Sequence, residues 1–178
     1  MKLLRLLTLL TGLWLGLPAA RAAETNLNAH LEPFRPFLEK TWRGPFKNSK
    51  PEQPKVDVAR WERALNGQAV RVLHSVNNGA YGGETLITWD AGRQSLVYHY
   101  FTTAGFSTTG TMRFEGGRVH AHETVTGDAG GVTEVRSTSE LRPDGVLAVK
   151  AEYLKNGVWT LGHEADYVVT AEARVVFR

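Results

Sequence analysis

The sequence predicts an all-β protein: a single antiparallel up-and-down β-barrel of about 8 to 10 strands, lipocalin-like, with a short N-terminal helix. Turn signals recur every 10 to 14 residues after Lys55. The segments between them alternate apolar and polar side chains and are rich in Val, Thr, Tyr and Trp. Strands do not alternate with long helical segments, which excludes doubly wound and TIM-barrel folds.

The first 22 residues have the composition of a secretory signal peptide. Lys2 and Arg5 flank the start of an apolar run, and small residues at Ala20 and Ala22 form a cleavage pattern. We therefore expect cleavage after Ala22, an exported bacterial protein that is periplasmic or secreted, and one mature domain over 23–178. The chain has no Cys, so its stability must come from the core without disulfides.

The charge balance changes when this segment is left out. The chain has 21 basic and 18 acidic residues, and Lys2, Arg5 and Arg21 account for the excess, so residues 23–178 are formally neutral. A neutral domain has no net field to attract phosphate backbones, which argues against a nucleic-acid partner. No second apolar run of about 18 residues follows, so we expect no membrane-spanning helix.

Residues 27–40 predict the short helix, and two prolines limit it to one or two turns. Its apolar residues recur at spacings of three and four, the period of one helical face: Leu27, Leu31, Phe34 and Leu38. We expect this helix to be a lid or plug on the barrel. A first strand follows, in which Trp42 should be buried at one end of the barrel, and 47–55 is a polar connection.

Eight turn signals divide the remaining chain. They lie at 66–67, 78–79, 90–92, 104–105, 116–117, 130–131, 144–145 and 156–157. Asn-Gly and Asp-Gly pairs supply the positive φ angles of tight hairpins, so consecutive strands should pair antiparallel. Residues 174–177 are a candidate last strand. About nine strands after the lead-in favour a closed barrel over a flattened sandwich, because closure removes exposed edges.

The two strands at 69–76 and 158–169 each place a His in an apolar row. His74 shares its face with valines, and His163 shares its face with Trp159 and Tyr167. Both rows should point into the barrel. Each His is therefore either a hydrogen-bonded core residue or a polar group in a ligand cavity.

Trp89 and His99 lie on the two predicted strands that follow the strand of His74. Aromatic residues there fill either a core or the lining of a cavity. Both faces of the strand that holds His99 are apolar, so alternation does not decide which face His99 occupies. Glu123 lies in an apolar row with Val119 and Val125. A buried carboxylate needs a partner, and a neighbouring His would make Glu123 an acid/base candidate.

His120 and His122 lie on one face of a strand, with side chains about 7 Å apart. Zinc sites use such pairs, but they need further ligands. The opposite row is the apolar one, so this pair should face solvent. We predict neither a metal nor a cofactor.

Four segments resemble the lipocalin-like, calycin-type bacterial exported domains of unknown function: “LEPFRPFLEKTWRG”, “GGETLITWD”, “LVYHYFTTAGF” and “TGTMRFEGG”. The likeness covers about residues 29–170 and implies a barrel closed at its base by Trp42, with no established activity. The Trp-Arg-Gly segment at 42–44 also resembles, more distantly, nitrobindin-type haem barrels. That resemblance implies His163 as an iron ligand, but “LGHEADY” and the missing Gly-rich continuation depart from that family.

These observations predict an exported barrel that binds a small apolar or amphipathic molecule. One alternative is a hydrolase- or isomerase-type enzyme that uses a cavity Glu/His pair, and another is a packed barrel that acts through its surface. The sequence has no Gly-x-Ser-x-Gly elbow, no His-Glu-x-x-His and no phosphate-binding Gly loop. An interior cavity of about 300 Å³ or more would favour binding. The ligand and the oligomeric state are left open.

Overall fold

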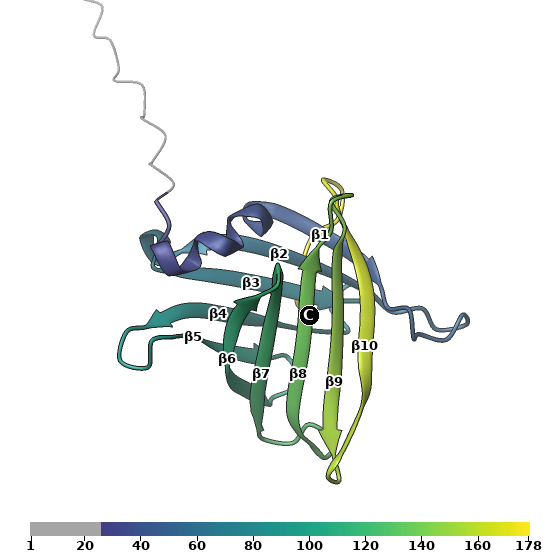
Figure 1. Ribbon diagram of the computed structural model, residues 1–178. Coiled ribbons are helices and arrows are strands. Elements are labelled where there is room, and N and C mark those ends of the chain that lie inside the picture. Colours follow the sequence, from purple (N-terminus) through teal and green to yellow (C-terminus); the bar gives the residue numbers. More distant parts are fainter. Residues whose placement is uncertain (1–25) are drawn as a thin grey trace, which may run out of the picture.

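The computed structural model describes residues 26–178, and these form a closed antiparallel barrel of ten strands with a short helix at one end (Figure 1). The predicted fold class is confirmed. The predicted signal peptide and its cleavage site lie outside the described residues.

Each strand pairs with its neighbours in the chain, and the first strand closes the barrel by pairing with the last. The strands are β1 (Lys40–Pro45), β2 (Val56–Ala64), β3 (Ala69–Val76), β4 (Tyr81–Asp90), β5 (Ser95–Thr102), β6 (Ser107–Glu115), β7 (Arg118–Thr126), β8 (Val132–Leu141), β9 (Leu147–Lys155) and β10 (Val158–Val169). Each of the eight turn signals separates two consecutive strands, as the sequence predicts. The turn at 66–67 forms a short 3-10 segment, η2 (Leu65–Gly67).

Closure depends on the short strand β1. Trp42 pairs with Val169 and Arg43 with Val168, and a further bridge joins Phe46 to Ala165. The backbone N–H of Lys47 also donates to the carbonyl of Glu164 at 2.7 Å. These bonds pair the edge of β10 that faces away from β9. The described barrel therefore has no long unpaired edge where its first and last strands meet.

The hairpin between β9 and β10 shows how turn chemistry sets the topology. Asn156 and Gly157 both have positive φ, at 51° and 75°. This is the backbone of a two-residue hairpin turn, which side chains other than Gly and Asn rarely adopt. The strands on either side therefore pair from their first residues, Lys155 with Val158.

The helix η1 (Ala29–Phe37) is a 3-10 helix that contacts β3 and β4 at one end of the barrel. Leu31, Phe34 and Phe37 are its buried residues. Their spacing of three is the period of a 3-10 helix, so Phe37 takes the place that the sequence assigned to Leu38. Phe34 packs edge-on against Phe114 of β6 at 4.8 Å between ring centroids. The helix thus fills this end of the barrel.

The C-terminal residues differ from the prediction. Residues 174–177 form no strand, but the backbone N–H of Val176 donates to the Ser75 hydroxyl at 3.0 Å. The segment is held by the outward side of β3 without joining the sheet ladder. Within residues 26–178, no helix has the length and apolar character that a membrane span requires.

Candidate ligand cavity

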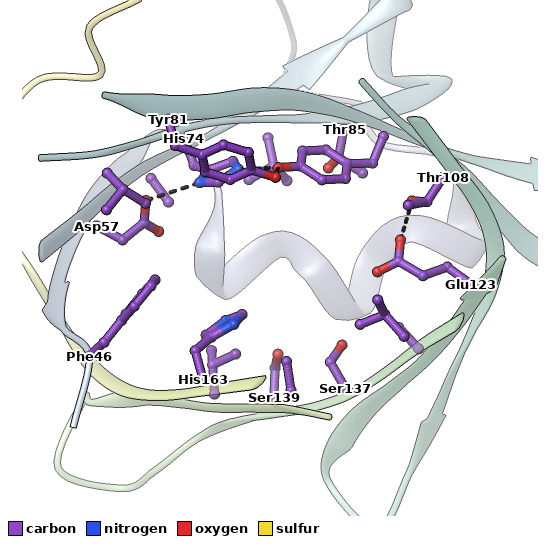
Figure 2. Close-up of a pocket in the computed structure, with 18 of the residues that line it drawn as sticks. Phe46, Asp57, His74, Tyr81, Thr85, Thr108, Glu123, Ser137, Ser139 and His163 are labelled. Carbon is purple, nitrogen blue, oxygen red and sulfur yellow. Dashed lines mark hydrogen bonds and ion pairs between the residues drawn. The ribbon is translucent and has the colours of Figure 1, made fainter. Parts of the chain in front are cut away.

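A cavity of about 610 Å³ occupies the barrel interior between η1 and the opposite end (Figure 2). Figure 2 shows the helix behind the cavity. At the other end the cavity is lined by Lys55, Asn77 and Ala80, which belong to connecting segments and are solvent-exposed. The cavity therefore reaches solvent at the end remote from η1. Its volume lies within the range of small-molecule sites, about 300 to 1,000 Å³.

The lining is largely apolar and aromatic because inward residues alternate with outward ones on every strand. Valines and alanines cover much of it. The aromatic residues that line it are Trp42, Phe46, Trp61, Tyr81, Tyr98, Tyr100, Phe106, Tyr153 and Tyr167. A few polar side chains face this surface and are the groups that could orient a ligand.

A chain of hydrogen bonds runs along one side of the cavity from β2 to β5. The Asp57 carboxylate lies 3.0 Å from Nδ1 of His74, and Nε2 of His74 lies 2.8 Å from the Tyr100 hydroxyl. That hydroxyl lies 2.7 Å from the hydroxyl of Tyr81. When His74 is neutral, the acidic partner places its proton on Nδ1, so Nε2 accepts from Tyr100 and Tyr100 accepts from Tyr81.

Asp57 is held from two sides. Its second oxygen accepts a hydrogen bond from the buried Tyr167 hydroxyl of β10 at 2.9 Å. Burial raises the pKa of Tyr167 well above its usual range, and the nearby charge of Asp57 raises it further. Tyr167 therefore stays protonated and remains a donor. A buried carboxylate with two donors is a stable arrangement.

Glu123 of β7 lies on a different side of the cavity, and its carboxyl points inward (Figure 2). It accepts a hydrogen bond from the hydroxyl of Thr108, and the Tyr98 hydroxyl lies near enough to influence its pKa. Burial raises the pKa of Glu123, while the two hydroxyls act in the opposite direction. Neither His74 nor His163 is hydrogen-bonded to Glu123, so the structure does not pair Glu123 with either His.

His163 of β10 reaches the cavity next to a β-bulge. Gly162 interrupts the pairing between β9 and β10, so Leu161 pairs with Glu152 and His163 with Ala151. Nδ1 of His163 lies 3.0 Å from the Tyr153 hydroxyl, and the imidazole stacks on Phe46 at 4.8 Å. Burial lowers the pKa of His163, which favours the neutral imidazole.

Four of the seven residues that the sequence nominated line the cavity: His74, Glu123, His163 and Tyr167. Trp89 points to the η1 end, where it stacks on His30 at 3.6 Å, and it is not part of the cavity lining. His99 is exposed on the outer face of β5, next to Phe101.

Trp159 is the clearest correction. It lies on the outer face, where the Arg136 guanidinium sits over its ring at 4.4 Å. The bulge at Gly162 adds one residue to β10, so the positions before it face the opposite side from simple alternation. Leu161, in the same predicted row, is likewise exposed.

Sequence reasoning missed Asp57, Tyr100, Tyr81 and Tyr153. Asp57 carried a readable signal, because it alternates with Ala59 and Trp61 and is the one acidic residue of that row. The same pattern had identified Glu123. No local pattern showed that Asp57 would meet a His from the neighbouring strand.

The His-x-His pair faces outward, as predicted. His122 bonds Glu134 at 2.7 Å, and His120 lies 3.4 Å from the Thr138 hydroxyl. Among the described residues, no group of three or more His, Cys, Asp or Glu side chains is placed to hold a metal ion.

Comparison with known proteins supports the fold. No protein-family model matches the chain, and a search of curated proteins found no match. Among solved structures, the chain is similar to the crystal structure of Rv2717c from M. tuberculosis, with a TM-score of 0.54 and 14% sequence identity. The match covers 83% of this chain and 100% of that chain. At this identity the likeness shows a shared fold and nothing about activity.

Proposed function

We propose that this protein is an exported barrel that binds a small apolar or amphipathic molecule in its interior. The observation that carries the proposal is the solvent-reaching cavity of about 610 Å³, lined by apolar and aromatic side chains with few polar groups. The lipocalin-like resemblance agrees with this role. A packed barrel acting through its surface would have a filled interior, so the cavity speaks against that alternative.

The test is saturable binding of a neutral fluorescent probe, N-phenyl-1-naphthylamine, with a matched pair of variants. Ser137 and Thr138 are neighbours on β8, but Ser137 lines the cavity and Thr138 lies on the outer face. Ser137→Phe should fill part of the cavity and weaken binding by about tenfold or more, whereas Thr138→Phe should leave it unchanged. Equal effects of both variants, or no saturable binding to the wild type, would reject an interior site.

Export rests on the N-terminal segment alone. Expression of the full chain in a bacterial host, followed by N-terminal sequencing of the periplasmic fraction, should return Ala23 as the first residue. Mature protein that still begins with Met1 would reject export by this signal. Native mass spectrometry of the same fraction would give the mass of any ligand that co-purifies.

The distant nitrobindin-type resemblance implies haem, and one side chain fits it. Because Nδ1 of His163 faces Tyr153, Nε2 is the nitrogen left to the cavity. A haem iron bound there would supply redox or gas-binding chemistry. Haemin titration distinguishes a haem site from a cavity that binds no metal. If His163 holds the iron, the wild type should develop a Soret band that His163→Phe lacks.

A second candidate function is acid–base catalysis, and the Asp57–His74 pair favours it. A carboxylate that fixes the tautomer of a His, whose other nitrogen meets a hydroxyl, is an arrangement that can move a proton. The hydroxyl belongs to Tyr100, which borders the cavity. Turnover of small aromatic esters or enolisable ketones that is lost in His74→Gln would support an enzyme. Probe binding without any such turnover would support the binding protein.

A further inference from the structure

Two acidic side chains, Asp57 and Glu123, face the cavity, and they differ in whether a positively charged group can lie next to them. Asp57 has a His neighbour within 3.0 Å that can carry a positive charge. Among the residues that the structure describes, the polar groups next to Glu123 are the neutral hydroxyls of Thr108 and Tyr98. Within residues 26–178, no Lys, Arg or His lies within ion-pair distance of Glu123. In this part of the chain the Glu123 carboxylate therefore has no counterion.

An unpaired carboxylate in such a place is costly, because burial removes water without supplying an opposite charge. Burial accordingly raises the pKa of Glu123. The Thr108 hydroxyl nevertheless donates to this carboxyl, and the nearby Tyr98 hydroxyl also favours its ionised form. A positive group on a bound ligand would complete this set.

The remainder of the lining also suits a cation. Lys55 lies at the solvent-exposed end, and burial lowers the pKa of His163, which favours its neutral form. Nine aromatic residues line the cavity, among them Tyr98 and Tyr100 on the strand next but one to Glu123. The faces of aromatic rings attract cations, more strongly where water is excluded. An acidic group within aromatic surroundings selects positive over negative ligands.

We propose that the cavity takes a hydrophobic amine, whose ammonium group pairs with the Glu123 carboxylate while its apolar part lies against the aromatic lining. This inference rests on the proposed function and adds the chemical class of the ligand. Because the ammonium ion pairs with the ionised carboxylate, a protonated Glu123 releases its proton when the amine binds. Up to one proton therefore leaves for each amine bound.

The other titratable groups around Glu123 do not supply this proton. Tyr81, Tyr98, Tyr100 and Tyr153, from β4, β5 and β9, all have raised pKa values, mainly through burial, and stay protonated. For Tyr153 the value rises to about 12. His122, on the outer face of the same strand, offsets a small part of the rise in the pKa of Glu123 that burial causes. Amine binding should weaken as the pH falls and Glu123 becomes harder to ionise.

The experiment compares three probes of similar shape: 4-phenylbutylamine, 4-phenylbutanol and 4-phenylbutanoate. Calorimetry near neutral pH, in two buffers of different ionisation enthalpy, gives both affinity and proton release. We expect the amine to bind about tenfold or more tighter than the alcohol, and the carboxylate to bind most weakly. Any proton release should accompany the amine alone, and it should grow as the pH is lowered towards the raised pKa of Glu123.

Glu123→Gln is the test variant, and Glu84→Gln, at an exposed position of β4 outside the cavity lining, is its control. Glu123→Gln should remove the preference for the amine and the proton release, yet keep alcohol affinity within about twofold. Glu84→Gln should change neither. A thermal melt of each variant confirms that it is folded.

The outcomes are separable. A carboxylate probe that binds as well as the amine, or an amine preference that survives in Glu123→Gln, would overturn the ligand class while alcohol binding still supports an interior site. If neither the three probes nor N-phenyl-1-naphthylamine binds the wild type, the proposed function fails, and this inference fails with it.

Discussion

Replacement of Trp42 by Ala tests how the η1 end of the barrel is held together. The ring is 1% exposed, and its indole N–H donates to the Phe37 carbonyl at 3.2 Å. Truncation of a buried Trp costs about 3 to 5 kcal/mol, against a total stability of about 5 to 15 kcal/mol for a domain. With a urea m-value of about 2 kcal/mol/M, the unfolding midpoint should fall by about 1.5 to 2.5 M.

Trp159→Ala is the matched control. This ring is partly exposed on the outer face, where the Arg136 guanidinium lies over it. A cation–π contact at such a site contributes about 0.5 to 1 kcal/mol to stability. Its midpoint should shift by less than about 0.5 M. Strict alternation along the sequence placed Trp159 inside the barrel, so equal losses for the two variants would refute the bulge and the outward position of Trp159.

Three further predictions concern the cavity. Burial lowers the pKa of His163 in the folded state, so the unfolded chain takes up this proton first and stability falls as the pH drops below about 6.5. Between about pH 7 and pH 5, the urea midpoint of His163→Gln should fall less than the midpoint of the wild type. If both midpoints fall equally, His163 is not buried as described. Glu123 has the opposite sign: its raised pKa means that stability relative to Glu123→Gln declines as the pH rises above about 4.3. Urea midpoints from about pH 4 to pH 8 check this, and a difference independent of pH would show that Glu123 is not desolvated. Gly162→Ala would place a Cβ against the Tyr153 ring, so we expect a loss of about 1 to 3 kcal/mol together with a shifted His163 imidazole resonance in NMR spectra. Wild-type stability in that variant would argue against the bulge geometry.

The strand topology could be predicted from the sequence because its determinants are local. Asn-Gly or Asp-Gly pairs mark four of the eight hairpins and other Gly-containing turns mark the rest, and alternation within a strand assigns its two faces. That is why His74, Glu123 and Tyr167 were correctly placed in the inner rows. The η1 plug and the burial of Trp42 were predicted on the same kind of local pattern.

Other features depend on distant parts of the chain. The bulge at Gly162 turns Trp159 outward, and a bulge is a property of two paired strands that alternation in one strand does not report.

The sequence by itself determined the barrel, its strand order and most of the rows of side chains that face inward. Only the tertiary structure decided which inward groups meet: Asp57 with His74, His163 with Tyr153, and Glu123 with the Thr108 hydroxyl. The physical reason is that the face of a residue follows from the two-residue period of its own strand. Its neighbours across the cavity follow from register and closure, which all ten strands set together.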